Sequence, residues 1–527
     1  MKINTVSGAC SGVLVAPQWV LTSTACFPNA TAYAAPPAAT MATVGRTTLS
    51  GTDGHVVGVA RVVPQPDRPV LLARLVAPVT DVLLAPVAAT PPQAGDSVFV
   101  AGYGRTGSEW VPDQPHLATA TVDAVNPTTF GISSGSGPTT CKGDAGGPAW
   151  RTNTGGGAEV LAVHQSSWQG GCLGETETRT GATETRVDDL HDTLRQQTSS
   201  PILARYLDLG GVTSFLGAPQ GGEYTVAGGS GQDYEHGSLY YSPATGVHSV
   251  QGLILGKYKE LGGPATFGFP LTDETTTPDG VGKYNHFSLA SGASIYWSPA
   301  TGAHGIEGAI RDKWSALGWE TGLGYPTTDE TSTADGVARY NTFSLSDGAA
   351  IYATPGTGAH ELRGEILKKW TALGAGPKLG YPTTDENTTP DGVGRYNHFS
   401  LAGGASIYWT PATGAHEIRG AIRQKWADLG WETGPGYPTT DENTTPDGIG
   451  KYNHFSGNAS IYWTSSTAAH IVYGTIRDTW ASLGWETSRL GYPTSDEYDI
   501  PGGRRNDFQH GNISWNASTN TTTATYI

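Results

Sequence analysis

The order of apolar and polar residues predicts a chain made mostly of short strands. Residues 10–27, CSGVLVAPQWVLTSTACF, place two apolar runs on either side of a Pro-Gln-Trp turn, which predicts a strand pair. Helical spacing is found in stretches such as residues 309–320, where Ile310, Trp314 and Leu317 stand at i, i+4 and i+7. We therefore expect a mainly β protein with short helices.

An internal repeat organises the last two thirds of the chain. The motif LGYPTTDE and its variants FGFPLTDE, PGYPTTDE, LGYPTSDE and LGAPQGGE occur six times, 51 to 56 residues apart. Each copy combines one helix, a turn and three strands, as in residues 283–297 and 301–308. One such unit cannot bury its apolar face alone, so neighbouring copies must stack. Six whole copies favour a closed, six-bladed propeller-like ring, with an open solenoid as the alternative. The motif glycines of copies one to six are Gly217, Gly268, Gly324, Gly380, Gly436 and Gly491.

Composition and charge narrow the class of protein. The chain has 527 residues, with 73 glycines, 34 prolines and 15% charged residues, which is typical of a turn-rich β protein with at least two domains. A net charge of −16 makes nucleic acid and anionic membrane surfaces poor partners. No run of about 18 apolar residues occurs, so membrane insertion is not expected.

The four cysteines indicate an oxidising compartment. They all lie in the first third and lack the close spacing of zinc ligands, so two disulfides fit better than a metal site, and we expect no metal and no cofactor. We therefore expect a secreted, extracellular protein. The segment MKINTVSGAC is not a signal peptide, so a secreted protein would have lost its leader before this chain begins. The cysteines are Cys10, Cys26, Cys141 and Cys172.

The first third resembles the trypsin-like serine proteases. Residues 10–27 are similar to the strand pair that ends at the family's catalytic histidine, and CKGDAGGPAW, residues 141–150, is similar to its nucleophile loop. The resemblance implies a chymotrypsin-like double β-barrel in residues 1–198. It also implies the disulfide pairs Cys10–Cys26 and Cys141–Cys172.

The residues that carry the family's chemistry are replaced. Ala25 stands at the histidine position, Ala145 at the serine position and Pro69 at the aspartate position, while Asp67 lies two residues early. Gln169 replaces a glycine of the specificity pocket and should obstruct it. Acyl transfer needs a nucleophile, a base and a group that orients the base, so we expect no peptidase activity. The alternative is an active protease inactivated by engineered alanines, against which Pro69 and Gln169 argue.

Two repeat positions change together and suggest sugar binding. The residue before the strand phenylalanine, or before Tyr234 in copy one, is His or Asp wherever the residue that closes the next strand is aromatic, and copy three has Thr342 and Ala353 instead. We expect each pair to be cross-strand neighbours that offer an aromatic plane and a hydrogen-bonding group to a sugar; a packing pair is the alternative. Copy three should therefore bind no sugar. The candidates are Tyr241, His286, Trp297, His398, Trp409, His454, Trp463 and Trp515.

Other repeated residues are interpreted as structural. A histidine closes the TGAH-type segment in five copies without a local second ligand, which indicates packing rather than metal binding. The Asp-Glu pairs of the motif are weaker site candidates, better explained by loop or helix-cap roles. The histidines are His248, His304, His360, His416 and His470, and the pairs begin at Asp273, Asp329, Asp385, Asp441 and Asp496.

Residues 199–527 resemble the LGFP repeats of secreted and envelope-associated actinobacterial proteins. Together with the trypsin-like domain, they resemble the lectin-bearing components of actinobacterial umbrella toxin particles. That resemblance implies a non-catalytic lectin that binds a cell-surface glycan through its repeats and docks into an antibacterial toxin assembly through its first domain. The alternatives are a secreted protease with an envelope-binding tail and a free-standing wall-binding protein.

Asp144 is the candidate for docking a partner subunit. The matching aspartate of active family members accepts a newly freed amino terminus, and this chain has only nine residues before Cys10. We expect a buried carboxylate without a partner of its own, which is costly unless another chain supplies the counter-charge. Hydrogen bonds from local backbone groups are the alternative.

Overall fold

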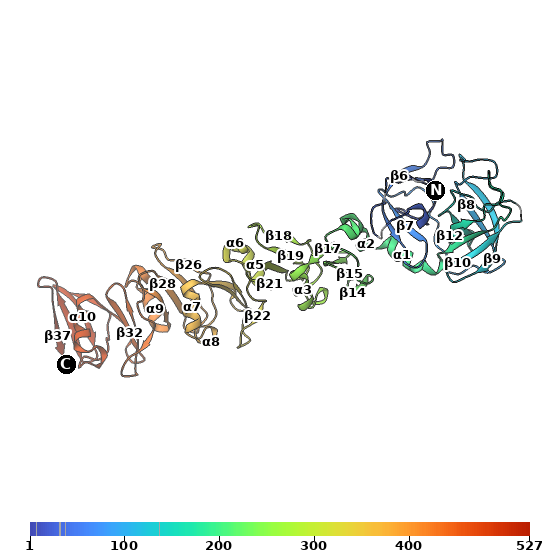
Figure 1. The fold of residues 1–527 in the computed structure, drawn as a ribbon. Helices are drawn as coiled ribbons and strands as arrows, with labels where there is room; N and C mark the ends of the chain where they lie inside the picture. Colours follow the sequence, from blue (N-terminus) through green and yellow to red (C-terminus); the bar gives the residue numbers. More distant parts are fainter. Residues whose placement is uncertain (7, 31–32, 37, 136) are drawn as a thin grey trace. The chain divides into compact units, whose positions relative to one another are not determined.

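The computed structural model describes residues 1–6, 8–30, 33–36, 38–135 and 137–527. The chain divides into two compact units, residues 1–248 and 249–527, and each is described by itself. The fold is mainly β in both units, as the sequence predicts (Figure 1).

The first unit opens with two antiparallel sheets that form a double barrel. The first sheet has seven strands in the order β2-β1-β5-β6-β7-β4-β3, and the second is a closed barrel in the order β10-β13-β12-β11-β8-β9. The first contains β1 (Lys2–Thr5), β2 (Gly8–Ser11), β3 (Val13–Ala16), β4 (Trp19–Ser23), β5 (Met41–Val44), β6 (His55–Pro64) and β7 (Val70–Leu75). The second contains β8 (Ser97–Gly102), β9 (His116–Val125), β10 (Thr129–Ser133), β11 (Pro148–Thr152), β12 (Ala158–Ser167) and β13 (Ala182–Arg186).

Apolar cores and disulfides hold the barrels together. The predicted strand pair is β3 with β4, and its valines and leucines are buried in two clusters with residues of β6 and β7. Both disulfides predicted by the resemblance are present, Cys10–Cys26 in the first half and Cys141–Cys172 beside the nucleophile loop.

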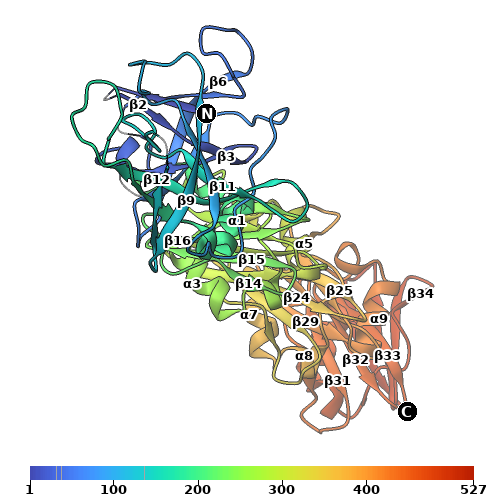
Figure 2. The same ribbon diagram turned by 90° about the vertical axis from the view of Figure 1, so that its right-hand side faces the viewer.

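Helices connect the barrels to the first repeat sheet within the same unit. Figure 1 shows α1 and α2 between the barrel strands and this sheet, and Figure 2 shows the same ribbon turned by 90°. Arg61 Nε donates to the carbonyl of Leu207 at 2.9 Å, and Arg74 pairs with Asp208 at 2.6 Å. These elements are η1 (Thr24–Cys26), η2 (Asp188–Leu190), α1 (His191–Ser199), α2 (Pro201–Leu209), η3 (Gly211–Thr213), β14 (Tyr224–Val226), β15 (Gly229–Tyr234), β16 (Gly237–Ser242) and β17 (Gly246–Gln251).

Each further copy is a four-stranded antiparallel sheet followed by helices. A short fourth strand, which the sequence pattern does not predict, lies at one edge of each sheet. The helices are α3 (Gly252–Glu260), α4 (Pro264–Phe267), α5 (Gly308–Ala316), α6 (Glu320–Leu323), α7 (Gly364–Ala372), α8 (Gly376–Leu379), α9 (Gly420–Asp428), η4 (Trp431–Thr433), α10 (Gly474–Leu483) and η5 (Trp485–Thr487). The sheets are β18 (Thr275–Thr276), β19 (Lys283–Phe287), β20 (Ala293–Ser298) and β21 (Gly302–Glu307); β22 (Thr331–Ser332), β23 (Arg339–Phe343), β24 (Ala349–Thr354) and β25 (Gly358–Arg363); β26 (Asn387–Thr388), β27 (Arg395–Phe399), β28 (Ala405–Thr410) and β29 (Gly414–Arg419); β30 (Asn443–Thr444), β31 (Lys451–Phe455), β32 (Ala459–Thr464) and β33 (Ala468–Tyr473); and β34 (Tyr498–Ile500), β35 (Gly503–Phe508), β36 (Gly511–Asn516) and β37 (Thr521–Tyr526).

The sheets of residues 249–527 stack through the helices between them. Helix α5 packs against β20 and β21 of its own copy and β24 and β25 of the next, and the helices of the later copies repeat this arrangement. The helix tryptophans that fill these layers are almost fully buried. Within this unit the copies follow one another as an open series, the solenoid alternative, and these contacts join neighbours along the chain rather than close a ring (Figure 1). The tryptophans are Trp314, Trp370, Trp426 and Trp480.

The repeat motif supplies the contacts between neighbouring copies. Gly324 has φ +81°, and an added Cβ would lie 2.9 Å from the backbone nitrogen of Leu345, so glycine is required there. The next motif residue, Tyr325, donates its hydroxyl proton to Asp279 in the turn of the preceding copy at 2.7 Å. The motif aspartate Asp385 of copy four pairs with Lys313 of copy two at 2.9 Å, so this contact spans copy three. The LGYP segment is therefore a joint between copies.

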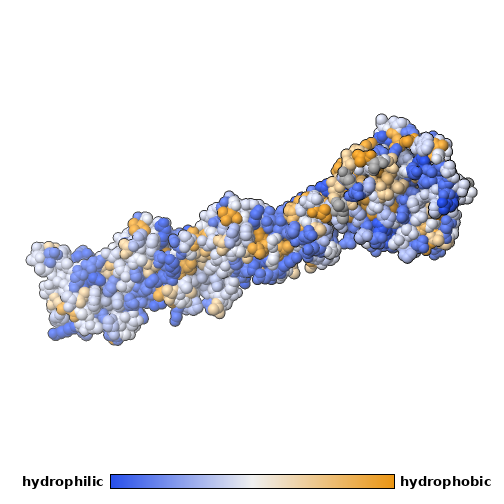
Figure 3. All heavy atoms as spheres, viewed as in Figure 1, coloured by the Kyte–Doolittle hydropathy of each residue, from blue (hydrophilic) through white to orange (hydrophobic). Residues whose placement is uncertain are grey.

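The surface of residues 249–527 is mainly hydrophilic, with separate apolar patches on the face in Figure 3. The turn before the second strand exposes one aliphatic side chain in each of copies two to five. No described helix is long and apolar enough to cross a membrane. The exposed aliphatic residues are Val281, Val337, Val393 and Ile449.

Candidate functional site

The structure brings the backbone of Ala25, Pro69 and Ala145, the three positions that we align with the family's catalytic residues, close together. The backbone N–H of Thr24, next to Ala25, donates to the carbonyl of Pro69 at 3.2 Å. Ala145 packs against the buried cluster that contains Cys26, the residue after Ala25. The side chains at these three positions are two methyl groups and a proline ring, none of which can take up or donate a proton.

Other side chains around this loop have different partners. Asp67 is half exposed and pairs with Arg68 at 2.7 Å. Gln169 adopts φ +68°, a conformation that favours the glycine found there in the family. Its Oε1 accepts from the backbone N–H of Lys142 at 2.9 Å, so its side chain is tied to the nucleophile loop.

Asp144 is fully buried and has three hydrogen-bond donors. Its carboxylate accepts from the backbone N–H groups of Gly104 and Cys141, each at 2.8 Å, and lies 2.9 Å from Nε2 of His116. The expectation of an unpartnered carboxylate is therefore wrong. The amino group of Met1 donates elsewhere, to the carbonyl of Gly12 at 3.1 Å. The alternative, hydrogen bonds from backbone groups, is correct for Gly104 and Cys141. His116 adds a side-chain partner that the sequence did not indicate.

The repeat histidines and tryptophans are not cross-strand neighbours. His286 is in register with Ser294, whereas Trp297 is in register with Lys283. Lys283 and His286 are three residues apart on one strand, so their side chains lie on opposite faces of the sheet. The expected pairing is wrong, and the same registers hold in the other copies.

Each of three histidines belongs instead to a network within its own copy. His398 Nδ1 lies 2.7 Å from Oγ of Ser406, which also accepts from Nε of Arg423 at 2.6 Å. The Arg423 guanidinium lies 5.0 Å from the centre of the Trp431 ring. Burial, with Arg423 nearby, lowers the pKa of His398 to about 4, so this imidazole is neutral at physiological pH. His286 and His454 have the same partners in copies two and five.

The tryptophan of this network is a feature that sequence reasoning missed. Trp431 has φ +58°, which is uncommon for a bulky residue, and the same position in copy three is Ala375. Copy three replaces the whole network with smaller or apolar residues, so its members change as one unit. The tryptophans are Trp319, Trp431 and Trp485, and the copy-three replacements are Thr342, Ala350, Leu367 and Ala375.

The tryptophans on the other face line grooves between consecutive copies. Trp409 of copy four lies with Arg395 and Glu386 opposite the start of α7 in copy three. Two further grooves repeat this arrangement, one between copies four and five and one between copies five and six. We call these three the tryptophan grooves. Their central residues are Trp409, Arg395 and Glu386; Trp463, Lys451 and Glu442; and Trp515, Arg504 and Glu497.

Charged residues of both signs line each tryptophan groove and are partly buried. Arg419 pairs with Glu442 at 3.1 Å, and Arg504 pairs with Glu497 at 3.2 Å. Burial, followed by repulsion from Glu361, raises the pKa of Glu386 to about 7. Each groove thus offers an aromatic plane beside hydrogen-bond donors and acceptors. The glutamates are the second residues of the Asp-Glu pairs, which the sequence analysis ranked as weaker candidates.

At the remaining candidate positions, the structure does not show the full set of tryptophan, cation and glutamate around a groove. Trp297 keeps the register with a cation, Lys283, whereas Tyr241 faces Ser230. Copy three keeps Arg339 and its ion pair with Glu330 but has Ala353 in place of tryptophan. Within the described residues, no cluster of three or more His, Cys, Asp or Glu side chains forms a metal site.

The repeated TGAH-type histidines lie in structural contacts. His360 Nε2 lies 2.9 Å from the carbonyl of Thr357, and its Nδ1 lies 3.3 Å from Asp385. Asp385 also accepts from the backbone N–H of Glu361 at 3.2 Å. These groups join the end of one copy to the motif of the next, so the motif aspartates are neither free loop residues nor helix caps.

Comparison with protein families identifies both parts of the chain. The family model named Trypsin matches residues 1–194. No curated protein matches the chain. The family model described as LGFP repeat matches residues 216–265, 267–322, 323–376, 379–434, 436–488 and 490–525. A trypsin-like domain followed by LGFP repeats fits an extracellular or cell-envelope protein.

Proposed function

Because the chain belongs to the LGFP repeat family and carries a trypsin-like domain ahead of its repeats, we propose that it is a secreted, non-catalytic carbohydrate-binding protein. The observation that carries the proposal is the set of tryptophan grooves. An indole plane covers the apolar face of a sugar ring, and the flanking Arg or Lys and Glu groups match its hydroxyls.

Several grooves on one chain suit a polymeric ligand. A single groove of this kind is shallow and open, and its affinity for one sugar is expected to be weak. Linked sites raise the overall affinity without any new contact when the ligand presents the same unit repeatedly. A glycan of a cell envelope is such a ligand, and we assign it as the target.

The trypsin-like domain has a supporting role in this proposal. Ala25, Pro69 and Ala145 supply no nucleophile, base or orienting carboxylate, so the domain holds a protein partner rather than cutting one. A larger secreted antibacterial toxin assembly is the partner that we propose. Copurification from the secreting strain tests this part, because recovery of the chain alone would contradict it.

A glycan array with the full chain tests carbohydrate binding. The variant with Trp409→Ala, Trp463→Ala and Trp515→Ala should bind much more weakly to the polymeric glycans that the unmodified chain retains. Trp110→Ala is the matched control, since Trp110 is 62% exposed and lies in the trypsin-like domain. Equal binding by the triple variant would contradict the assignment of the grooves.

A further inference from the structure

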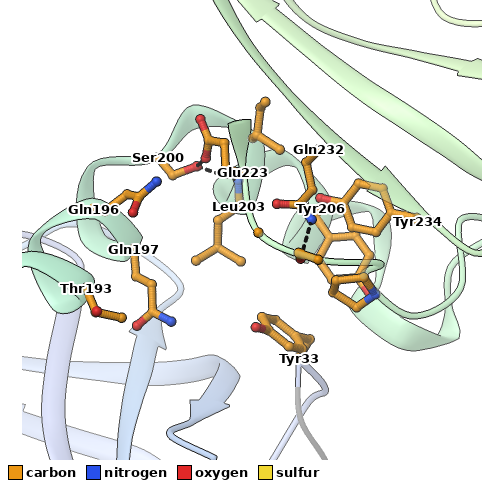
Figure 4. Close-up of a pocket in the computed structure, with 14 residues that line it drawn as sticks. Tyr33, Thr193, Gln196, Gln197, Ser200, Leu203, Tyr206, Glu223, Gln232 and Tyr234 are labelled. Carbon is orange, nitrogen blue, oxygen red and sulfur yellow. Dashed lines mark hydrogen bonds between the residues drawn. The ribbon is translucent and has the colours of Figure 1, made fainter. Parts of the chain in front are cut away.

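A second kind of pocket lies in the first compact unit and shares no residue with the tryptophan grooves. Its walls come from the first barrel, from α1 and α2, and from the first repeat sheet (Figure 4). The polar and aromatic side chains that matter here are Tyr33, Gln196, Gln197, Glu223, Gln232 and Tyr234.

The pocket exists because copy one has no preceding sheet. In later copies a buried asparagine reaches back to the last strand of the copy before it, as when Asn397 donates to the carbonyl of Glu361 at 3.1 Å. Gln232 holds the corresponding register position in copy one and donates to the carbonyl of Gly221, in its own copy, at 2.9 Å. Tyr33 and residues of α1 line the pocket together with Gln232.

The walls of the pocket are fixed before any ligand arrives. The ion pair Arg74–Asp208 and the hydrogen bond from Arg61 to Leu207 join α2 to the first barrel. The Tyr206 ring stacks on Tyr234 with ring centres 4.5 Å apart. A preformed site loses little freedom on binding, which favours even a small ligand.

The polar groups of the pocket are mainly acceptors and neutral amides. Glu223 accepts from the hydroxyls of Ser200 and Ser230 at 2.5 and 2.6 Å, which fixes its carboxylate. Its counterparts Glu442 and Glu497 pair with arginine, but none of the described residues that line this pocket is a cation. Gln197 accepts from Gln65 through its Oε1, which leaves its own N–H groups as donors.

We propose that this pocket binds a single sugar residue that carries hydroxyl or amino groups and no negative charge. The Glu223 carboxylate accepts from the ligand's hydroxyl or amino group, the glutamine amides donate to its oxygens, and Tyr33 faces the ring. An acidic sugar is repelled by the carboxylate. The site is separate from the tryptophan grooves and differs from them in having no cation.

An extended peptide is the weaker occupant for this space. A peptide strand bound here would need an acceptor for its backbone N–H. Between copies three and four, Asp385 of copy four accepts from the backbone N–H of Glu361 in copy three. Copy one has Gly222 at that motif position, which provides no side-chain acceptor.

Saturation-transfer NMR on the full chain tests the proposal, with glucose, glucosamine and glucuronic acid as probes. Glucose and glucosamine should receive saturation and glucuronic acid should not. Glu223→Gln should weaken glucosamine binding about tenfold and glucose binding about twofold, and Gln196→Ala, at the exposed rim, should weaken both. Gln220→Ala, in the loop that contains Glu223 but outside the pocket lining, is the control and should change the binding of neither glucose nor glucosamine.

The same spectra separate this proposal from the function of the grooves. Binding that survives Glu223→Gln and Gln196→Ala, but is lost when the groove tryptophans are replaced, places the sugar in the grooves and overturns this site. Binding of glucuronic acid equal to that of glucose, or no saturation of glucose and glucosamine, also overturns it. Normal thermal unfolding of the Glu223→Gln variant excludes loss of fold as the cause.

Discussion

Asp144 shows how the trypsin-like domain satisfies a buried carboxylate without a newly freed amino terminus. Two backbone N–H groups and His116 point at its oxygens, although His116 is 28 residues away along the chain. An internal imidazole thus stands where active family members are expected to use a chain terminus. The nucleophile loop is held in place by the domain's own residues.

Replacing His116 tests this contact. We expect His116→Ala to lower the free energy of unfolding of the first domain by about 1–3 kcal/mol, because it removes one donor from a fully buried carboxylate. Calorimetric unfolding of the full chain measures the change. His55→Ala, which breaks an exposed pair with Asp81, is the control and should cost less than about 0.5 kcal/mol. Equal effects of the two variants would contradict the account.

Placing histidine and serine at positions 25 and 145 tests the expectation that the trypsin-like domain has no peptidase activity. We expect the double variant Ala25→His and Ala145→Ser to cleave no peptide substrate, because Pro69 provides no carboxylate to orient the histidine and Gln169 is tied across the loop. Hydrolysis of generic chromogenic peptides is the measurement. Robust turnover would show instead that the chain is an active protease inactivated by two substitutions.

At the scale of elements, buried asparagines hold consecutive copies together. Asn397 is fully buried and donates to the carbonyls of Glu361 and Thr384. We expect Asn397→Ala to destabilise the repeats by about 2 kcal/mol, since two buried carbonyls lose a donor. Urea unfolding followed by tryptophan fluorescence measures this. Asn387→Ala, at an exposed position, should leave the unfolding midpoint almost unchanged, and a similar shift for both would refute the role of the asparagine.

The groove between copies three and four should make stability depend on pH. The pKa of Glu386 is raised from 4.5 in the unfolded chain to about 7 in the fold, so its protonated form is favoured when folded. Its stabilising contribution is complete below about pH 4.5 and is lost as the pH rises through about 7. The full shift corresponds to about 3 kcal/mol, and solvent screening of this partly buried group reduces the expected loss, relative to Glu386→Gln, to roughly 2 kcal/mol over this range. The exposed Glu365→Gln serves as the control, and parallel pH profiles for the parent and Glu386→Gln would contradict the assignment.

The sequence predicts the helices and strands better than it predicts the sheet face on which each side chain lies. Spacing indicates the strand pair in residues 10–27 and the helix that contains Trp314, and the structure contains both. It does not indicate that His286 and Trp297 lie on opposite faces, because that depends on the hairpin register, and a one-residue error inverts every side chain. The partner of Asp144 was equally hidden, since tertiary contact alone brings His116 to it. The contacts that the LGYP segments make between copies are visible only in the structure.

At the scale of the whole molecule, the proposal rests on sites that recur from copy to copy. Copy three is an internal test of the pattern, because it keeps Arg339 and Glu330 in place but presents Ala353 where its neighbours have tryptophan. If the indole plane is the element that makes a groove bind, its absence should leave the groove of copy three without sugar binding.

Adding the missing tryptophan tests the central claim most directly. On a glycan bound by the unmodified chain, Ala353→Trp should strengthen binding by about threefold to tenfold, since one more linked site adds to the avidity. Ala353→Leu, which adds apolar volume without an aromatic plane, should leave the affinity unchanged. Surface plasmon resonance on the immobilised glycan measures both. A gain with Ala353→Trp alone is the predicted result, and no gain, or an equal gain with leucine, would contradict the claim that the tryptophan grooves bind carbohydrate.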